Sequence, residues 1–196
     1  MNADEEKRIE ALLGVWFGLP GTPDYDRPRQ VWFTVDPAFD ALLRERFQAD
    51  QTRAASGGYD HWAAARDPAL ALVLLLDQLP RNLYRGTAQA YASDAKARSV
   101  ARLALAQGFD AAVSAVRRGF FYLPFEHSED LADQELSLRL FGALHPEAER
   151  DSQLRYARRH RDIIARFGRF PHRNAALGRA TTAAEAAFLQ EPDSSF

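Results

Sequence analysis

Apolar residues recur at helical spacing along most of the chain, and the first such stretch covers residues 4–17. Ile9, Leu12, Leu13 and Trp16 are three or four positions apart, which places them on one face of a helix. The acidic residues at its start favour the positive end of the helix dipole. Residues 18–31, rich in glycine, proline and aspartate, are predicted to form a loop.

A short β-branched and aromatic run follows at residues 31–35. It has no second run to pair with, so we expect an extended lead-in instead of a strand. Asp36 and Pro37 then form a helix-start signal, an N-cap followed by proline at the first helical position. The helix they begin is expected to end before Gly57.

Asp67 and Pro68 repeat that start signal. Residues 69–76 are almost entirely apolar, so the helix they form has no polar face and is predicted to be central. We expect Pro80 to end it, because proline lacks the backbone N–H that an inner helical position needs.

Five further helices are expected after Pro80. One starts at Ser93 or Asp94, has Leu103 on its inner face and ends at Gly108; a shorter one covers residues 110–118. Ser128 is predicted to cap the next, since its hydroxyl can accept from a free N–H of the first turn. Gln134 lies on an apolar stripe of that helix and is expected to face inward.

Pro146 is predicted to begin a long helix that ends at Gly168, with Tyr156 and His160 on its inner face. Thr182 and Glu185 fit a capping box for one more, final helix. Residues 191–196 are expected to form a tail. The pattern thus predicts an all-α array of seven to nine helices, packed as helical hairpins, in a single domain spanning residues 1–196.

The composition of the chain excludes several kinds of functional site. The 196-residue chain has no cysteine, which excludes disulfides, thiolate nucleophiles and thiolate metal sites. No apolar run approaches the roughly 20 residues of a membrane helix, and an acidic N-terminus does not suit a secretory signal, so we expect a cytoplasmic protein. The chain has a net charge of −2, and the negative charge of its acidic tracts offsets most of the positive charge of its basic tracts. Both observations argue against nucleic acid as a partner.

Three long motifs resemble those of the mainly bacterial family known as domain of unknown function 924. They are the segments 74–87, 121–130 and 166–179, in that order. The resemblance implies a fold similar to tetratricopeptide-repeat hairpins, and it implies neither an agreed activity nor catalytic residues. Phe125 and Glu126 depart from the apolar pair expected of the family, which bears only on local packing.

The bend at residues 166–174 concentrates positive charge. Gly168 suits a left-handed position past a helix end, and Pro171 prevents the helix from continuing. Arg166, Arg169 and Arg173 crowd around it, so anions are expected nearby. Those anions are either carboxylates from elsewhere in the fold or a ligand.

Polar residues at helix ends and inward faces together predict a cleft that binds a small anionic molecule or an acidic peptide end. Guanidinium groups with imidazole and amide donors suit carboxylate and phosphate. The candidate ligand-binding residues are Asp77, Arg81, Asn82, Arg85, Gln134, Arg169, His172, Arg173 and Asn174. His127 and His160 are the candidate catalytic acid–base groups.

Structural interpretations compete with this one. Asp77 can form a buried clamp with Arg81 or Arg85, and His160 can be a core histidine. A hydrolytic triad of His127 with Ser128 is disfavoured, because sequence neighbours rarely point together. No metal-binding spacing is present, so neither a metal nor a cofactor is assigned. The alternative functions are a peptide- or protein-interaction module without catalysis and a metal-assisted hydrolase; the sequence gives no oligomeric state.

Overall fold

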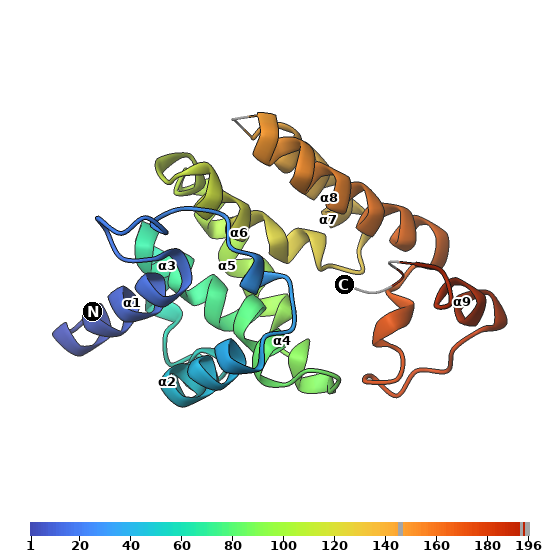
Figure 1. Ribbon diagram of the computed structural model, residues 1–196, viewed down its shortest axis with the longest axis horizontal. Helices are drawn as coiled ribbons and strands as arrows, with labels where there is room; N and C mark the ends of the chain where they lie inside the picture. The colour runs from blue at the N-terminus through green and yellow to red at the C-terminus, as the bar shows by residue number, and fades with distance from the viewer. Residues whose placement is uncertain (145–146, 193, 195–196) are drawn as a thin grey trace.

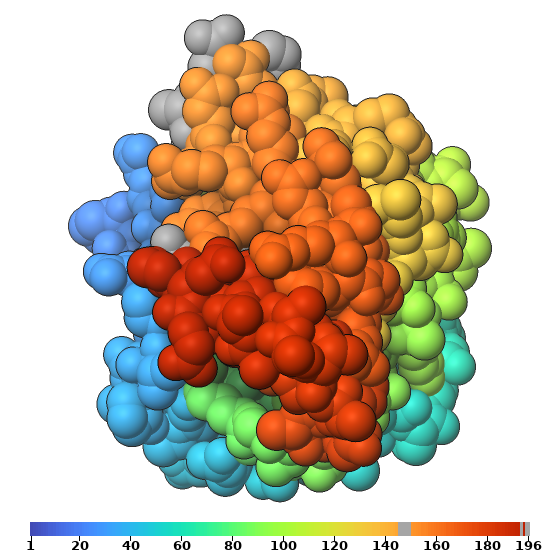
Figure 2. Space-filling model, turned by 90° about the vertical axis from the view of Figure 1, so that its right-hand side faces the viewer, coloured from blue at the N-terminus to red at the C-terminus, as the bar shows by residue number. Residues whose placement is uncertain are grey.

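A computed structural model of the chain describes residues 1–144, 147–192 and 194. Over these residues the fold contains helices and turns but no strand, which confirms the predicted all-α array. The number of helices in this part of the chain falls within the expected range. In Figure 1, α1 and α2 lie at one end of the molecule and α9 at the other, which is the end that faces the viewer in Figure 2.

The helices, in chain order, are α1 (Ala3–Phe17), α2 (Pro37–Ala55), α3 (Arg66–Val73), α4 (Leu79–Leu83), α5 (Asp94–Ala106), α6 (Ala115–Glu126), α7 (Leu131–Gly142), α8 (Glu147–Phe167) and α9 (Ala183–Phe188). A π-helical segment, Leu74–Gln78, joins α3 to α4. Short 3-10 turns occur at Gln30–Trp32, Asp60–Ala64, Ala88–Ala90, Asp110–Ala112 and Pro171–Arg173.

The apolar run is central, as predicted. Residues 69–76 are fully buried, and α3 contacts α1, α5 and α6. Burying the apolar side chains of this run stabilises the fold by about 2 kcal/mol for each large one. On the opposite side of α6, α7 and α8 lie side by side and extend the array toward the C-terminus (Figure 1).

Pro80 does not end the central helix, contrary to expectation. The chain passes through a π-helical turn, in which the N–H of Leu79 reaches the carbonyl of Leu74, and α4 then carries Pro80 within its first turn. The carbonyl of Leu76, four residues before the proline, instead accepts the hydroxyl of Ser93 at 2.6 Å. The wider turn and this side-chain donor together accommodate the missing N–H.

Residues 31–35 are not an extended lead-in. Gln30–Trp32 forms a 3-10 turn, and the indole Nε1 of Trp32 donates to the carbonyl of Trp16 at 3.0 Å. The Trp16 and Trp32 rings stack with centroids 6.3 Å apart. Burial of Trp32 against α1 therefore shapes this segment more than its β propensity does.

Several helix starts differ from prediction. The proposed 110–118 helix is a 3-10 turn followed by α6, which continues to Glu126 and contains Pro124. The N-cap of α7 is Asp130, not Ser128, because the Asp130 carboxylate accepts from the N–H of Ala132 at 2.8 Å. Asp67 lies inside the first turn of α3, and the N-cap residue of this helix is Ala65.

Other local signals are confirmed. Asp36 caps α2, Thr182 and Glu185 form a capping box at α9, and Gly168 takes a φ of +68° directly after α8. Two residues expected to face inward, Leu103 and Tyr156, are instead 53% and 50% exposed. The expectation that Pro146 begins α8 lies outside the described residues.

Among the helices of the described residues, none is both long enough and apolar enough to cross a membrane.

Candidate ligand-binding site

Polar side chains from six segments meet beside α8. We call this group the histidine cluster; its members are Asp77, Arg81, Asp94, Glu126, His127, His160, His172 and Arg173. They come from the π-helical segment, α4, the start of α5, the end of α6, α8 and the 3-10 turn Pro171–Arg173. The three stretches that the sequence analysis singled out therefore each contribute to one neighbourhood.

Asp77 and His127 form its centre. The fully buried carboxylate of Asp77 lies 2.8 and 3.0 Å from Nδ1 of His127, and Gln78 donates to it at 2.6 Å. Burial alone would raise the pKa of Asp77, but His127 and the Arg81 charge outweigh it and hold that pKa well below its usual range. Asp77 is consequently ionised at neutral pH and can only accept hydrogen bonds.

His127 is a neutral imidazole in this setting. Burial and the positive charge of Arg81 lower the pKa of His127 despite the opposing influence of Asp77. Because Asp77 accepts from Nδ1, the proton resides on Nδ1 and the lone pair on Nε2. No hydrogen bond to Nε2 is found among residues 1–144, 147–192 and 194, and the His127 side chain remains 13% exposed.

Arg81 and Arg173 share one carboxylate. Arg81 donates to both oxygens of Asp94, over 2.9 and 3.0 Å, whereas Arg173 reaches Asp94 only at 3.4 Å. The Arg173 guanidinium lies 4.6 Å from the ring centroid of Tyr91 and 4.4 Å from that of Phe170. Those two rings hold its plane, and desolvation lowers the pKa of Arg173 to about 10.

His172 follows Phe170 in the same turn, with ring centroids 5.6 Å apart. Burial and the neighbouring charges of Arg173 and Arg81 lower the pKa of His172 to about 3. The imidazole is thus neutral at physiological pH. The burial of this side chain and the two nearby arginines strongly disfavour a further positive charge here.

His160 and Glu126 make a buried and uncharged pair. Nδ1 of His160 lies 2.9 Å from the Tyr156 carbonyl and 3.2 Å from Oε1 of Glu126, and the His160 ring is 6.3 Å from that of His127. Burial and the Asp77 charge raise the pKa of Glu126 to about 8, while burial lowers the pKa of His160 well below its usual value. Neither side chain carries charge at pH 7.

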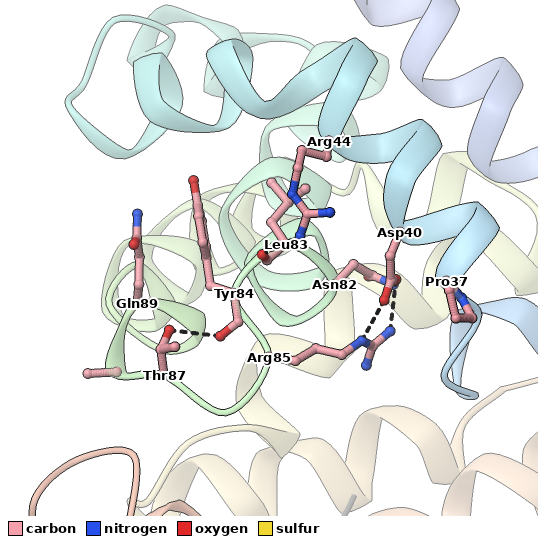
Figure 3. A pocket seen from close by; sticks show the side chains of 10 residues that line it. Pro37, Asp40, Arg44, Asn82, Leu83, Tyr84, Arg85, Thr87 and Gln89 are labelled. Carbon is pink, nitrogen blue, oxygen red and sulfur yellow. Dashed lines mark hydrogen bonds and ion pairs between the residues drawn. The ribbon is translucent and has the colours of Figure 1, made fainter.

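Asn82 and Arg85 lie outside the cluster. Both turn toward α2, where Arg85 donates to the two oxygens of Asp40 at 2.7 and 2.9 Å and Asn82 donates at 2.8 Å. The three side chains line one wall of an open pocket of about 660 Å³, which Arg44 and Tyr84 also border (Figure 3). The structure therefore divides the polar side chains of the 74–87 motif between two places.

Arg169 and Asn174 belong to a third group. Arg169 holds both oxygens of Glu185, at 2.6 and 2.9 Å, and Asn174 approaches the same carboxylate at 3.4 Å. This group ties the bend after α8 to α9. Arg169 and Arg85 thus each have a carboxylate from the fold, which is the structural interpretation of their charge.

Gln134 stabilises the chain around the end of α6, next to the cluster. Its amide nitrogen donates to the carbonyls of Glu126 and Ser128, each at 2.6 Å, and so satisfies the open C-terminal end of α6. Ser128 donates to Asp133 at 2.8 Å. That bond directs the hydroxyl away from a triad with His127.

Sequence reasoning missed two members of the cluster, Asp94 and Glu126, and also Tyr91, whose ring packs on Arg173. The sequence presents Asp94 as a helix start and Glu126 as a departure in local packing, and it gives no signal at Tyr91. Asp94 and Glu126 reach the cluster through the packing of α5 and α6, whereas Tyr91 lies in the turn before α5. In the part of the chain that the structure describes, no group of three histidine, aspartate or glutamate side chains is arranged to hold a metal ion.

The fold and this cluster define an all-α protein that encloses a network of histidine, arginine and aspartate side chains. Residues 12–193 match the family described as "Bacterial protein of unknown function (DUF924)". The chain belongs to this family, as the resemblance in its three motifs implied.

Among solved structures, the chain is similar to a protein of unknown function, ATU0120, from Agrobacterium tumefaciens. The two are 42% identical, the match covers 95% of this chain and 99% of that one, and the TM-score is 0.84. No curated protein matches the chain.

Proposed function

We propose that the histidine cluster binds a small anionic molecule through a carboxylate or phosphate group. The proposal assigns the ligand to Arg173 and His172, with Arg81 and His127 beside them. It leaves Asn82, Arg85, Arg169, Asn174 and Gln134 in structural roles, because each already has a partner in the fold.

The main support for this proposal is that the Arg173 side chain is incompletely paired. Among the described residues, Asp94 is the one carboxylate within ion-pair distance of this side chain, and Arg81 already occupies both of its oxygens. Nε of Arg173 is buried with no hydrogen-bond partner in the described chain. A buried guanidinium is costly unless it is paired, and a bound anion would complete its pairing.

The other nearby acids do not serve this purpose. Glu129 accepts from Arg179 at 2.6 and 3.0 Å and from the N–H of Phe170 at 2.8 Å. Glu126 is protonated at neutral pH, as its raised pKa of about 8 indicates. The pKa of His172 is lowered mainly by burial and further by the charges of Arg173 and Arg81, and this second cause indicates positive potential at this place.

Solvent reaches the cluster at its edge. The side chains of Arg81 and His127 are 20% and 13% exposed. This limited access favours a small molecule over a long peptide.

A thermal-shift titration with inorganic phosphate and with succinate tests the proposal. We expect the melting temperature to rise with the logarithm of the anion concentration, by roughly 5 to 10 °C at 100 times Kd. Arg173→Gln should abolish the rise, whereas Arg158→Gln, on the exposed face of α8, should keep it. His172→Asn provides a second variant that retains Arg173 and should weaken the response.

Two results would overturn the proposal. One is a native protein that responds to neither anion; the other is an Arg173→Gln variant that responds as well as the native one. Either result would favour the interaction module, whose tetratricopeptide-like surface would then be the functional part.

We also propose a cytoplasmic location, with which a chain free of cysteine is compatible.

A further inference from the structure

We infer that His127 is the general base of this site and that its substrate is an anionic ester hydrolysed by water. The inference rests on the proposed function, because the anionic group of the ester would occupy Arg173. It assigns a reaction class to the cluster and separates the role of His127 from that of His160.

The His127 ring has a fixed orientation. Asp77 accepts from Nδ1 at 2.8 Å, and Asp77 is itself fixed by Gln78 at 2.6 Å and by Arg81 at 3.4 Å. A carboxylate in this position selects the tautomer whose Nε2 lone pair can take a proton. Asp77 is therefore a positioning residue, and His127 is the group that meets the substrate.

Nε2 of His127 is the ring atom that can meet a substrate. In the described chain no hydrogen bond occupies this atom, and the side chain is partly exposed, so Nε2 is available to solvent or ligand. The Ser128 hydroxyl is committed to Asp133 at 2.8 Å, and the sequence has no cysteine. With neither of these nucleophiles beside the ring, water is the attacking group.

His127 and His160 have different surroundings. His160 is 5% exposed, and its Nδ1 lies between the Tyr156 carbonyl and Glu126. Its ring packs edge-on against Phe170, with centroids 5.5 Å apart. His160 thus positions Phe170 and His127, and its burial keeps it from the substrate.

The reaction balances without any other reactant. Nε2 of His127 takes a proton from water as the water oxygen forms a bond to the carbonyl carbon, and the negative charge moves to the carbonyl oxygen. The bond from carbon to the leaving oxygen then breaks. The proton passes from Nε2 to that oxygen, which yields a carboxylic acid and an alcohol and regenerates neutral His127.

The probe is 4-nitrophenyl hydrogen succinate, an activated ester that carries a carboxylate. Rates are taken relative to hydrolysis in buffer alone, because the carboxylate of the probe also attacks its own ester. On that scale we expect the native protein to accelerate the probe more than the neutral 4-nitrophenyl acetate, and to be inhibited by succinate. His127→Asn should lower the rate by roughly 100-fold or more. Asparagine keeps a donor near the place of Nδ1, so its bond to Asp77 preserves the fold while Nε2 is lost.

His61→Gln is the control for unspecific reaction at a surface histidine. His61 is 47% exposed and pairs with Glu5 at 2.9 Å, on the α1 side of the molecule. The rate should be unchanged in this variant. A loss of rate with His61→Gln, or an unchanged rate with His127→Asn, would refute the inference.

The pH profile tests the positioning role of Asp77. The charged and titratable groups facing His127 are Asp77, Arg81, Asp94, His160 and His172. Asp77 raises the pKa of His127, so Asp77→Asn should move the acidic limb of the rate profile to lower pH while reducing the plateau. A purely structural role would lower the plateau and leave the limb in place.

The two proposals fail separately. If succinate stabilises the native protein but His127→Asn hydrolyses the probe at the native rate, anion binding stands and the general base is wrong. If succinate neither stabilises nor inhibits the protein, the anion site is wrong, and the general-base inference falls with it.

Discussion

Arg81 donates to both carboxylate oxygens of Asp94, over 2.9 and 3.0 Å, and thereby occupies the carboxylate nearest to Arg173. Arg81 also donates to the Asp77 carbonyl at 2.6 Å. One side chain thus joins α4 to the start of α5 while leaving a second buried cation incompletely paired. The arrangement suggests that Arg81 is structural and Arg173 is open to a ligand.

Arg81→Leu should destabilise the fold strongly. It would leave the buried carboxylates of Asp77 and Asp94 without their shared cation, and removing one partner of a buried pair costs about 3 to 5 kcal/mol. Urea unfolding measures the change. Arg158→Leu, on an exposed position of α8, serves as the control and should change the free energy of unfolding by less than about 0.5 kcal/mol.

Glu126→Gln should stabilise the protein as pH rises. The folded-state pKa of Glu126 is about 8, whereas a free glutamate titrates near about 4.3, so the unfolded chain loses this proton first. The protonated carboxyl contributes its full stabilisation below the pKa of the unfolded chain. This contribution is lost as the pH rises from that value to the pKa of the folded protein. Glutamine does not ionise and avoids that loss.

The measurement is the free energy of unfolding of both proteins at pH 5 and pH 8. The difference in favour of Glu126→Gln should grow by roughly 1 kcal/mol or more between these pH values. A difference that stays constant or shrinks would show that Glu126 is ionised in the folded protein.

Arg169→Ala should lower the melting temperature without affecting anion binding. Arg169 holds both oxygens of Glu185 and also donates to the Ala180 carbonyl at 2.8 Å, so its loss loosens α9 from the bend after α8. Phosphate titration of the variant should still give the native shift. If the shift disappears, the ligand site extends to Arg169, as the sequence alone suggested.

Gly168→Ala should destabilise the end of α8 by about 1 kcal/mol. The residue has a φ of +68°, a region that a side chain disfavours even though open space surrounds the point where a Cβ would lie. Gly142→Ala is the matched control, because Gly142 ends α7 with equal space and no positive φ. Thermal unfolding should show a loss for the first and a gain of about 0.5 kcal/mol for the second.

Signals that depend on a few neighbouring residues were predictable from the sequence. The Asp36 cap, the capping box of Thr182 and Glu185 and the left-handed Gly168 each follow from local backbone chemistry. The central position of residues 69–76 was equally accessible, since a helix without a polar face must be covered on all sides.

The partners of the polar residues were not predictable in the same way. The sequence grouped Asp77 with Arg85, but Arg85 binds Asp40, which is 45 residues away and reaches it only because α2 packs on α4. Asp94 likewise enters the cluster through the approach of α5 to the π-helical segment. Such pairings depend on tertiary packing, and no pattern of spacing in one segment encodes them.

The π-helical turn Leu74–Gln78 makes chain length as important as residue identity in this stretch. Deleting one residue there would give an ordinary α-helical turn and rotate everything before it by about 100° relative to α4. Asp77 and Arg81 could then no longer reach His127 and Asp94 together. Homologous chains can therefore exchange side chains in this segment, but we expect insertions and deletions to fall in the surface loops instead.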